Sequence, residues 1–97
     1  MTGKQRAYLR ALANGIDAKY QIGKDGINDE TIKMLDLALE ANELIKIKIL
    51  ENSLLETRSV SDVLCEHTGA YPVQCIGNKV VLYRESQKNK VIVIPRK

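Results

Sequence analysis

The amino-acid sequence predicts an α/β fold, a two-layer sandwich in which helices pack on a mixed four-stranded sheet. Segments whose apolar residues recur at helical spacing alternate with short β-type runs along the chain. The last two β-type runs flank Gly77-Asn78, a dipeptide typical of a two-residue hairpin turn. Together these features give the order α-β-α-β-α-β-β in one domain that spans residues 1–97.

The first helix is expected from Thr2 to about Asn14. Thr2 suits the N-cap because its hydroxyl can accept a hydrogen bond from a free N–H of the first turn. Gly15 follows the last turn and suits the position after the helix, where a left-handed residue is common. Four apolar residues recur at helical spacing and are expected to face the core: Ala7, Tyr8, Ala11 and Leu12.

The second helix should begin after Asn28 and run to about Asn42. Asn28 is a favoured N-cap residue, and the two acids that follow it suit the positive end of the helix dipole. Ile27 and Ile32 occupy the two positions that pack together in a hydrophobic staple. The start of this helix is therefore well defined by local sequence.

The third helix is expected to begin at Ser59 and to end before Gly69. Ser59 is an acceptable N-cap, and Asp62 lies three residues later in a place like that of a capping box. Gly69 is a suitable stop because glycine adopts the left-handed conformation without a steric penalty.

Four strands are expected, at residues 18–22, 44–50, 73–76 and 79–84. Segment 44–50 alternates between isoleucine and lysine, so one face of this strand should be buried and the other should carry Lys46 and Lys48. The open face of the sheet is therefore expected to be basic. Segment 91–94 fits either a short edge strand or an extended tail before Pro95.

The composition is that of an ordinary globular domain, with 44% hydrophobic and 28% charged residues. No apolar run reaches the length of a membrane span, and the first residues lack the apolar core of a signal peptide. These features predict a soluble, cytoplasmic protein without a membrane partner.

The cysteines and the histidine do not predict a metal or cofactor site. Cys65 and Cys75 are ten positions apart, and His67 is the only histidine. This spacing matches neither a zinc motif nor a disulfide framework. We expect two thiols that pack as small hydrophobic groups, with no metal, cofactor or small-molecule substrate.

Charge is unevenly distributed along the chain although the net charge is only +3. Residues 1–24 carry five basic side chains and one acid, and residues 77–97 carry six and one. The stretch between them has four bases and ten acids. If the fold brings the two basic ends together, one face will suit a polyanion.

The segment Gly23-Lys24-Asp25-Gly26 is the strongest candidate for a binding site. It lies between an expected strand and an expected helix start. Glycine lets a backbone approach a ligand closely, lysine supplies a positive charge, and a helix start directs N–H groups at an anion. Asp25 is acidic and should weaken the attraction. Together these parts predict contact with a phosphate backbone.

No catalytic arrangement is present in the sequence. The chain has no HExxH motif and no nucleophile elbow, and the loop is neither a P-loop nor a GxGxxG fingerprint. An enzyme acting on a phosphate group would need an acid–base pair beside Lys24, where Asp25 is the only nearby candidate. We therefore expect a protein that is not an enzyme.

Several blocks of the sequence together resemble one family, the CRM domain (chloroplast RNA splicing and ribosome maturation), in its single-domain bacterial YhbY-type form. The blocks that carry the resemblance are Thr2–Arg6, Tyr8–Arg10, Gln21–Ile27, Glu43–Lys48, Val73–Gly77 and Val81–Arg84. They cover nearly the whole chain. The combination is much more specific than the GxxG loop alone.

The resemblance implies an RNA-binding protein that acts on large ribosomal subunit precursors during ribosome assembly. It also implies a fold similar to the C-terminal domain of translation initiation factor three, with a GxxG loop comparable to that of KH domains. Carried over position by position, the implied RNA-binding residues are Gly23, Lys24, Asp25, Gly26, Lys4, Arg6, Arg10 and Arg84. The main alternative is a protein-interaction module that docks a basic partner through its acidic central helix.

Overall fold

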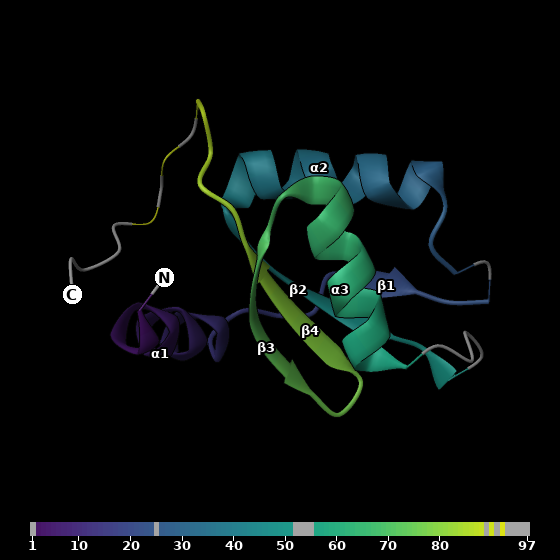
Figure 1. Ribbon diagram of the computed structural model, residues 1–97, viewed down its shortest axis with the longest axis horizontal. Coiled ribbons are helices and arrows are strands. Elements are labelled where there is room, and N and C mark those ends of the chain that lie inside the picture. The colour runs from purple at the N-terminus through teal and green to yellow at the C-terminus, as the bar shows by residue number, and fades with distance from the viewer. Residues whose placement is uncertain (1, 25, 52–55, 89, 91, 93–97) are drawn as a thin grey trace.

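The computed structural model of the protein describes residues 2–24, 26–51, 56–88, 90 and 92. Its elements follow the expected order (Figure 1). They are α1 (Gly3–Ala13), β1 (Tyr20–Ile22), α2 (Asp29–Asn42), β2 (Leu44–Ile49), α3 (Thr57–Thr68), β3 (Tyr71–Ile76) and β4 (Lys79–Tyr83). The predicted α/β class and element order are confirmed.

The four strands form one mixed sheet in the order β1-β2-β4-β3. β1 pairs with β2 in parallel, and the other two pairs are antiparallel. The hairpin between β3 and β4 turns at Gly77-Asn78 as expected, and Gly77 has a φ of 58°, a conformation that favours glycine. The predicted mixed four-stranded sheet is confirmed.

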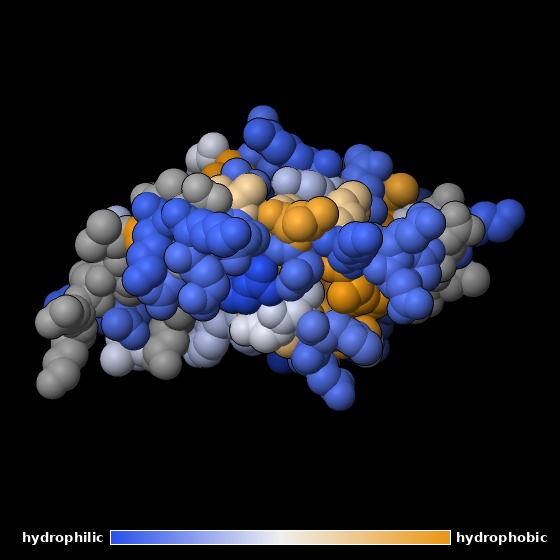
Figure 2. Space-filling model, turned by 90° about the horizontal axis from the view of Figure 1, so that it is seen from above, coloured by the Kyte–Doolittle hydropathy of each residue, from blue (hydrophilic) through white to orange (hydrophobic). Residues whose placement is uncertain are grey.

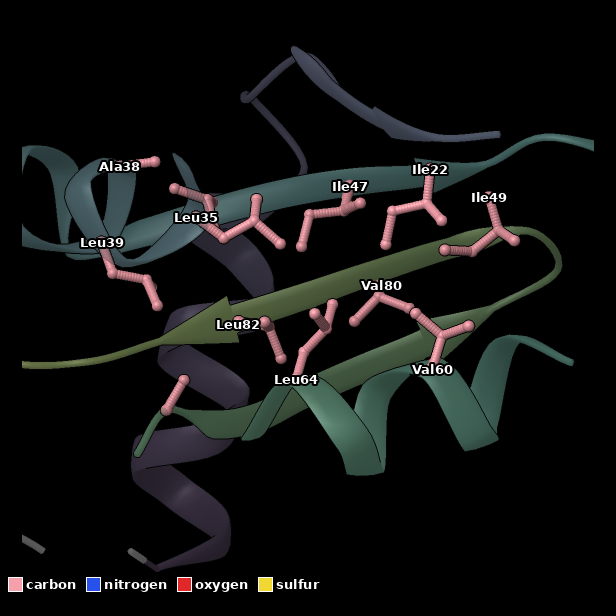
Figure 3. Close-up of a cluster of buried hydrophobic side chains, with 12 residues drawn as sticks. Ile22, Leu35, Ala38, Leu39, Ile47, Ile49, Val60, Leu64, Val80 and Leu82 are labelled. Carbon is pink, nitrogen blue, oxygen red and sulfur yellow. The ribbon is translucent and has the colours of Figure 1, made fainter. Parts of the chain in front are cut away.

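The main core lies between one face of the sheet and the helices α2 and α3 (Figure 3). It is built from aliphatic side chains that alternate along the strands and recur at helical spacing in the helices. Its members are Ile22, Leu35, Ala38, Leu39, Ile45, Ile47, Ile49, Val60, Leu64, Ala70, Val80 and Leu82. Ile27 and Ile32 both pack against this cluster, and the predicted staple contact between them stays a prediction.

Helix α1 packs on the opposite face of the sheet and forms a second, smaller cluster with it. The buried members of this cluster are Leu9, Ala13, Leu44, Val73, Val81 and Tyr83. The sheet therefore has helices on both faces, and α1 adds a partial third layer to the predicted pair of layers. It covers the end of the sheet at which β2 begins and β4 ends.

The expected buried stripe of α1 was wrong. Leu9 and Ala13 face the sheet with exposed fractions of 0% and 1%, whereas Tyr8 and Leu12 are exposed by 39% and 38%. Leu9 and Ala13 are also i,i+4 neighbours, so the helical spacing alone left two adjacent stripes to choose from. The position of the sheet decided between them.

Local signals placed most helix ends correctly. Thr2 forms a capping box with Gln5, and Asn28 accepts a hydrogen bond from the Thr31 N–H at 2.9 Å. Gly69 ends α3 in the left-handed conformation, as predicted. The predicted N-cap of α3 was wrong, because the helix begins at Thr57 and Ser59 lies within its first turn.

Two glutamates hold the chain that follows β4. The Glu43 carboxylate is fully buried and accepts hydrogen bonds from the N–H groups of Ser86 and Ile92, each at 2.8 Å. Glu40 accepts from the Ser86 hydroxyl and from the Gln87 N–H. Glu43 also has a φ of 66°, which is uncommon for a residue with a Cβ.

The segment 91–94, for which the sequence left strand and tail open, lies outside the described residues except for Ile92. Ile92 has no regular secondary structure and packs against the cluster beneath α1. No helix among the described residues combines the length and the apolar character that crossing a membrane requires.

Candidate nucleic-acid interface

The GxxG loop joins the end of β1 to the start of α2. The Gly26 N–H donates to the Gly23 carbonyl at 2.9 Å, which closes a tight turn. Gly26 has a φ of 67°, so this position needs glycine for conformational reasons as well as for close approach. Lys24 is exposed, and Asp25 lies outside the described residues. The loop borders a hollow of about 310 Å³ whose lining includes Gly23, Lys24 and Gly26.

The start of α2 is a weaker anion site than the sequence predicts. Asn28 already accepts the Thr31 N–H, and Asp29 and Glu30 place two carboxylates in the first turn. Glu30 also lines the hollow beside Lys24. These carboxylates satisfy the helix dipole and repel a phosphate at the same place. Attraction at the loop therefore depends mainly on Lys24.

The basic residues of α1 have different environments. Lys4 and Arg10 are exposed. Arg6 is half-buried: its guanidinium donates a hydrogen bond to the Tyr71 hydroxyl and lies 5.3 Å from the centre of the Tyr71 ring. This arrangement is a cation–π contact that ties α1 to the edge strand β3. Lys4 and Arg10 are thus freer than Arg6 to contact a ligand.

Arg84 is held within the fold. Its guanidinium forms an ion pair with Asp36 and donates to the carbonyls of Thr68 and Asp36 at 2.8 and 2.9 Å. These contacts join the end of β4 to α2 and to the last turn of α3. The charge of Arg84 is already paired, so the geometry favours a structural role, and its role in RNA binding stays a prediction.

The structure does not gather the predicted site residues in one place. The loop between β1 and α2 lies at one end of the long axis of the molecule, and α1 lies at the other (Figure 1). The molecule extends 39 Å along that axis. Lys24 and the basic residues of α1 therefore form separate positive regions. The two basic ends of the sequence meet where Val81, Tyr83 and Ile92 pack beneath α1.

Lys46 and Lys48 lie on the face of the sheet opposite the main core, as the alternation in β2 predicts. Both are half-buried. Lys48 is directly opposite Lys79 of β4, and this pairing was invisible in the sequence because it depends on strand register. The only sequence signal was that both residues belong to β-type runs.

The cysteines have the environments expected of packed thiols. Cys65 on α3 and Cys75 on β3 are half-buried, unbonded to one another, and in contact with the main core. Burial raises the pKa of the Cys65 thiol, which makes it a poor nucleophile at neutral pH. Among the described residues, no three histidine, cysteine or acidic side chains come close enough to hold a metal ion.

The outer face of α2 bears on the protein-interaction alternative. Asp36 is paired with Arg84, and Glu40 and Glu43 bind the segment after β4. Two of the four acids of this helix, Asp36 and Glu40, are thus engaged internally, whereas Asp29 and Glu30 are exposed. Figure 2 shows hydrophobic residues in the middle of this face with hydrophilic residues around them, and Met34 and Leu37 are exposed by 42% and 63%.

These features define a small α/β protein with an exposed lysine on a glycine-rich loop and further lysines on one sheet face, which are typical of a polyanion-binding domain. The chain belongs to the CRS1/YhbY (CRM) domain family, whose family model matches residues 1–84. The resemblance identified from the sequence is confirmed.

Similar proteins agree with this family over nearly the whole chain. "Probable RNA-binding protein YqeI" of Bacillus subtilis is 43% identical over 98% of this chain and 99% of its own. An RNA-binding protein of Haemophilus influenzae is 31% identical over 100% of this chain and 97% of its own. The solution structure of a hypothetical protein from Staphylococcus aureus has a TM-score of 0.77 at 43% identity, covering 98% of this chain and 99% of that one.

The names of these relatives agree with the expectation that the protein is not an enzyme. The expected likeness to translation initiation factor three stays a prediction, as do the individual RNA contacts.

Proposed function

We propose that this protein binds structured RNA, and that its natural ligand is ribosomal RNA of large-subunit precursors during ribosome assembly. The observation that carries the proposal is membership of the CRM family across residues 1–84, together with relatives named as RNA-binding proteins over almost their full length. The proposal includes a cytoplasmic location, where bacterial ribosome precursors are assembled.

The loop supplies the first contact in this proposal. Gly23 and Gly26 carry no side chain, so a phosphate oxygen can approach the backbone of the turn. The exposed Lys24 ammonium group adds a mobile positive charge beside it. Lys4 and Arg10 on α1 form a second positive region, while Arg6 and Arg84 mainly hold the elements in place.

The mode of recognition is expected to be the RNA backbone and shape rather than base stacking. RNA-recognition sheets stack bases on rows of exposed aromatic rings. This chain has four tyrosines and no tryptophan or phenylalanine. Tyr83 is buried, and Tyr71 is occupied by Arg6. The binding energy should therefore be largely electrostatic and sensitive to salt.

The test is RNA affinity measured from about 50 mM to about 200 mM salt, the range over which phosphate contacts weaken strongly. Wild type, Lys24→Ala and Lys33→Ala should be compared on large-subunit precursor RNA and on an unrelated structured RNA. Lys33 is the matched control because it is exposed on the outer face of α2. Lys24→Ala should reduce the salt slope by about 0.7–0.9, the value for one phosphate contact.

Each outcome has a definite meaning. Preference for the precursor RNA supports the ribosomal ligand, and equal affinity for both RNAs supports only general RNA binding. A Lys24→Ala protein that binds with the wild-type salt slope contradicts the role of the loop. Weak binding of both RNAs by folded wild type contradicts the proposal and favours a protein partner.

A further inference from the structure

We propose that the uncovered end of the sheet, on the face opposite α2 and α3, is a second RNA-backbone surface centred on Lys48 and Lys79. This inference rests on the proposed function and deepens it, because it assigns phosphate contacts to residues outside the GxxG loop. In this proposal, the RNA strand continues from the loop along the neighbouring sheet face.

Strand register places four side chains in one row across the sheet. Gln21 of β1 is opposite Lys48, Lys48 is opposite Lys79, and Lys79 is opposite Ile76. The neighbours of these residues along each strand point into the main core, so the row itself lies on the other face. The four strands thus present a continuous strip at this end of the sheet.

Helix α1 leaves this strip open. Val81 and Tyr83, which lie further along β4 on the same face, are buried beneath α1 with exposed fractions of 2% and 8%. Lys79, two residues before Val81, is exposed, and Ile76 is exposed by 62%. The cover provided by α1 therefore ends between Val81 and Lys79.

The two lysines are an unfavourable pair for the folded protein alone. Directly opposite residues on neighbouring strands have Cβ atoms about 4.5–5.5 Å apart, and like charges in such pairs destabilise a sheet. Neither ammonium group forms an ion pair with an acid in the part of the chain that the structure describes. A phosphate placed between them would turn repulsion into two attractions.

The strip is continuous with the GxxG loop. β1 ends at Ile22, one residue after Gln21, and Lys24 follows two residues later at the same end of the sheet. Three positive charges therefore border this end: Lys24, Lys48 and Lys79. Two acids lie among them: Glu30 lines the hollow beside Lys24, and Glu51 lines a hollow of about 370 Å³ together with Lys48 and Asn78. The phosphate contact is therefore assigned to Lys48 and Lys79, where strand pairing brings two positive charges together.

A single charge reversal at Lys48 distinguishes the loss of an RNA contact from a loss of folding. Lys48→Glu should create an attraction to Lys79 and so raise the urea midpoint of unfolding, while it weakens RNA binding. The salt slope should fall by at least about 1, the value for one lost phosphate contact, and the loss should be similar for different RNA sequences. Lys33→Glu on the outer face of α2 is the matched control and should leave the salt slope unchanged.

The outcomes distinguish this inference from the proposed function. If wild type binds RNA and Lys48→Glu binds with the same salt slope, the sheet surface is refuted and the proposed function stands. If folded wild type does not bind RNA, both are refuted. If an acidic polypeptide competes as well as RNA for wild type but not for Lys48→Glu, the strip binds an acidic protein and the RNA assignment is overturned.

Discussion

Arg84 offers a sharp test of the difference between a structural arginine and an RNA contact. Replacing it with alanine removes an ion pair to Asp36 and hydrogen bonds to two carbonyl groups. A hydrogen bond with a charged partner contributes about 1.5–3 kcal/mol when it is buried. The hydrogen bond to the Thr68 carbonyl is partly buried and should account for most of the stability that Arg84 contributes.

The other two contacts of Arg84 should contribute less. The Asp36 side chain is 52% exposed, so water can solvate its carboxylate when the arginine is absent. An exposed ion pair contributes about 0.2–1 kcal/mol. The bond to the Asp36 carbonyl is also exposed to solvent. We therefore expect Arg84→Ala to lower the free energy of unfolding by about 2–3 kcal/mol.

The assay is urea unfolding at neutral pH, with a thermal scan beside it. For a domain of this size, a loss of about 2 kcal/mol corresponds to a fall in melting temperature of roughly 10 °C. Arg58→Ala is the control, because Arg58 is an exposed arginine on α3. Its effect should stay within about 0.5 kcal/mol, as for most surface substitutions.

RNA affinity measured on the same variant completes the test. At a temperature where Arg84→Ala is folded, its affinity and salt slope should match those of wild type. Stability unchanged within about 0.5 kcal/mol, together with a lower salt slope, would refute the structural reasoning and make Arg84 a phosphate contact.

Three further predictions concern the fold around the candidate site. Leu9→Ala should lower the free energy of unfolding by about 2–5 kcal/mol, whereas Leu12→Ala should lower it by less than about 1 kcal/mol, because only the first side chain is buried; equal losses in urea unfolding would contradict the observed face of α1. Gly26→Ala should lower the free energy of unfolding by about 1–2 kcal/mol because Gly26 has a positive φ, whereas Gly15→Ala should be nearly neutral, since its Cβ would meet no atom closer than 3.8 Å. Urea unfolding measures both losses, and a neutral Gly26→Ala would contradict the turn geometry. Hydrogen bonds from Ser86 and from the following N–H groups hold the pKa of the Glu40 carboxyl below its ordinary value of 4.5, so the stability that this carboxylate contributes is complete above pH 4.5 and is lost as pH falls through the lowered folded-state pKa. Glu40→Gln should therefore be less stable than wild type at neutral pH, and the two proteins should become equally stable in acid. A constant difference in stability between them, in urea unfolding at several pH values, would exclude this linkage.

Much of the local structure could be predicted because short-range chemistry determines it. Thr2 and Asn28 cap helices with their own side chains, and Gly69 ends a helix by adopting a conformation that other residues rarely take. The turn at Gly77-Asn78 is determined in the same way. The prediction of Ser59 as the N-cap failed because this residue, although a good cap, lies in the first turn of a helix that begins earlier, at Thr57.

The candidate site was only partly predictable. The sequence identified the GxxG loop because its residues are adjacent along the chain, and it identified Lys46 and Lys48 because strand alternation places them on one face. It could not show that Lys79 faces Lys48, since cross-strand register depends on residues distant in sequence. It also could not show that Arg84 is already paired.

By itself, the sequence determined the family, the order of helices and strands, most helix ends and the position of the glycine-rich loop. These properties depend on neighbouring residues or on periodicity along one segment. The tertiary structure alone decided which side of α1 is buried, how far the loop lies from the basic helix, and which lysines share a sheet face. Those properties follow from packing and strand pairing, which join residues that the linear sequence keeps apart.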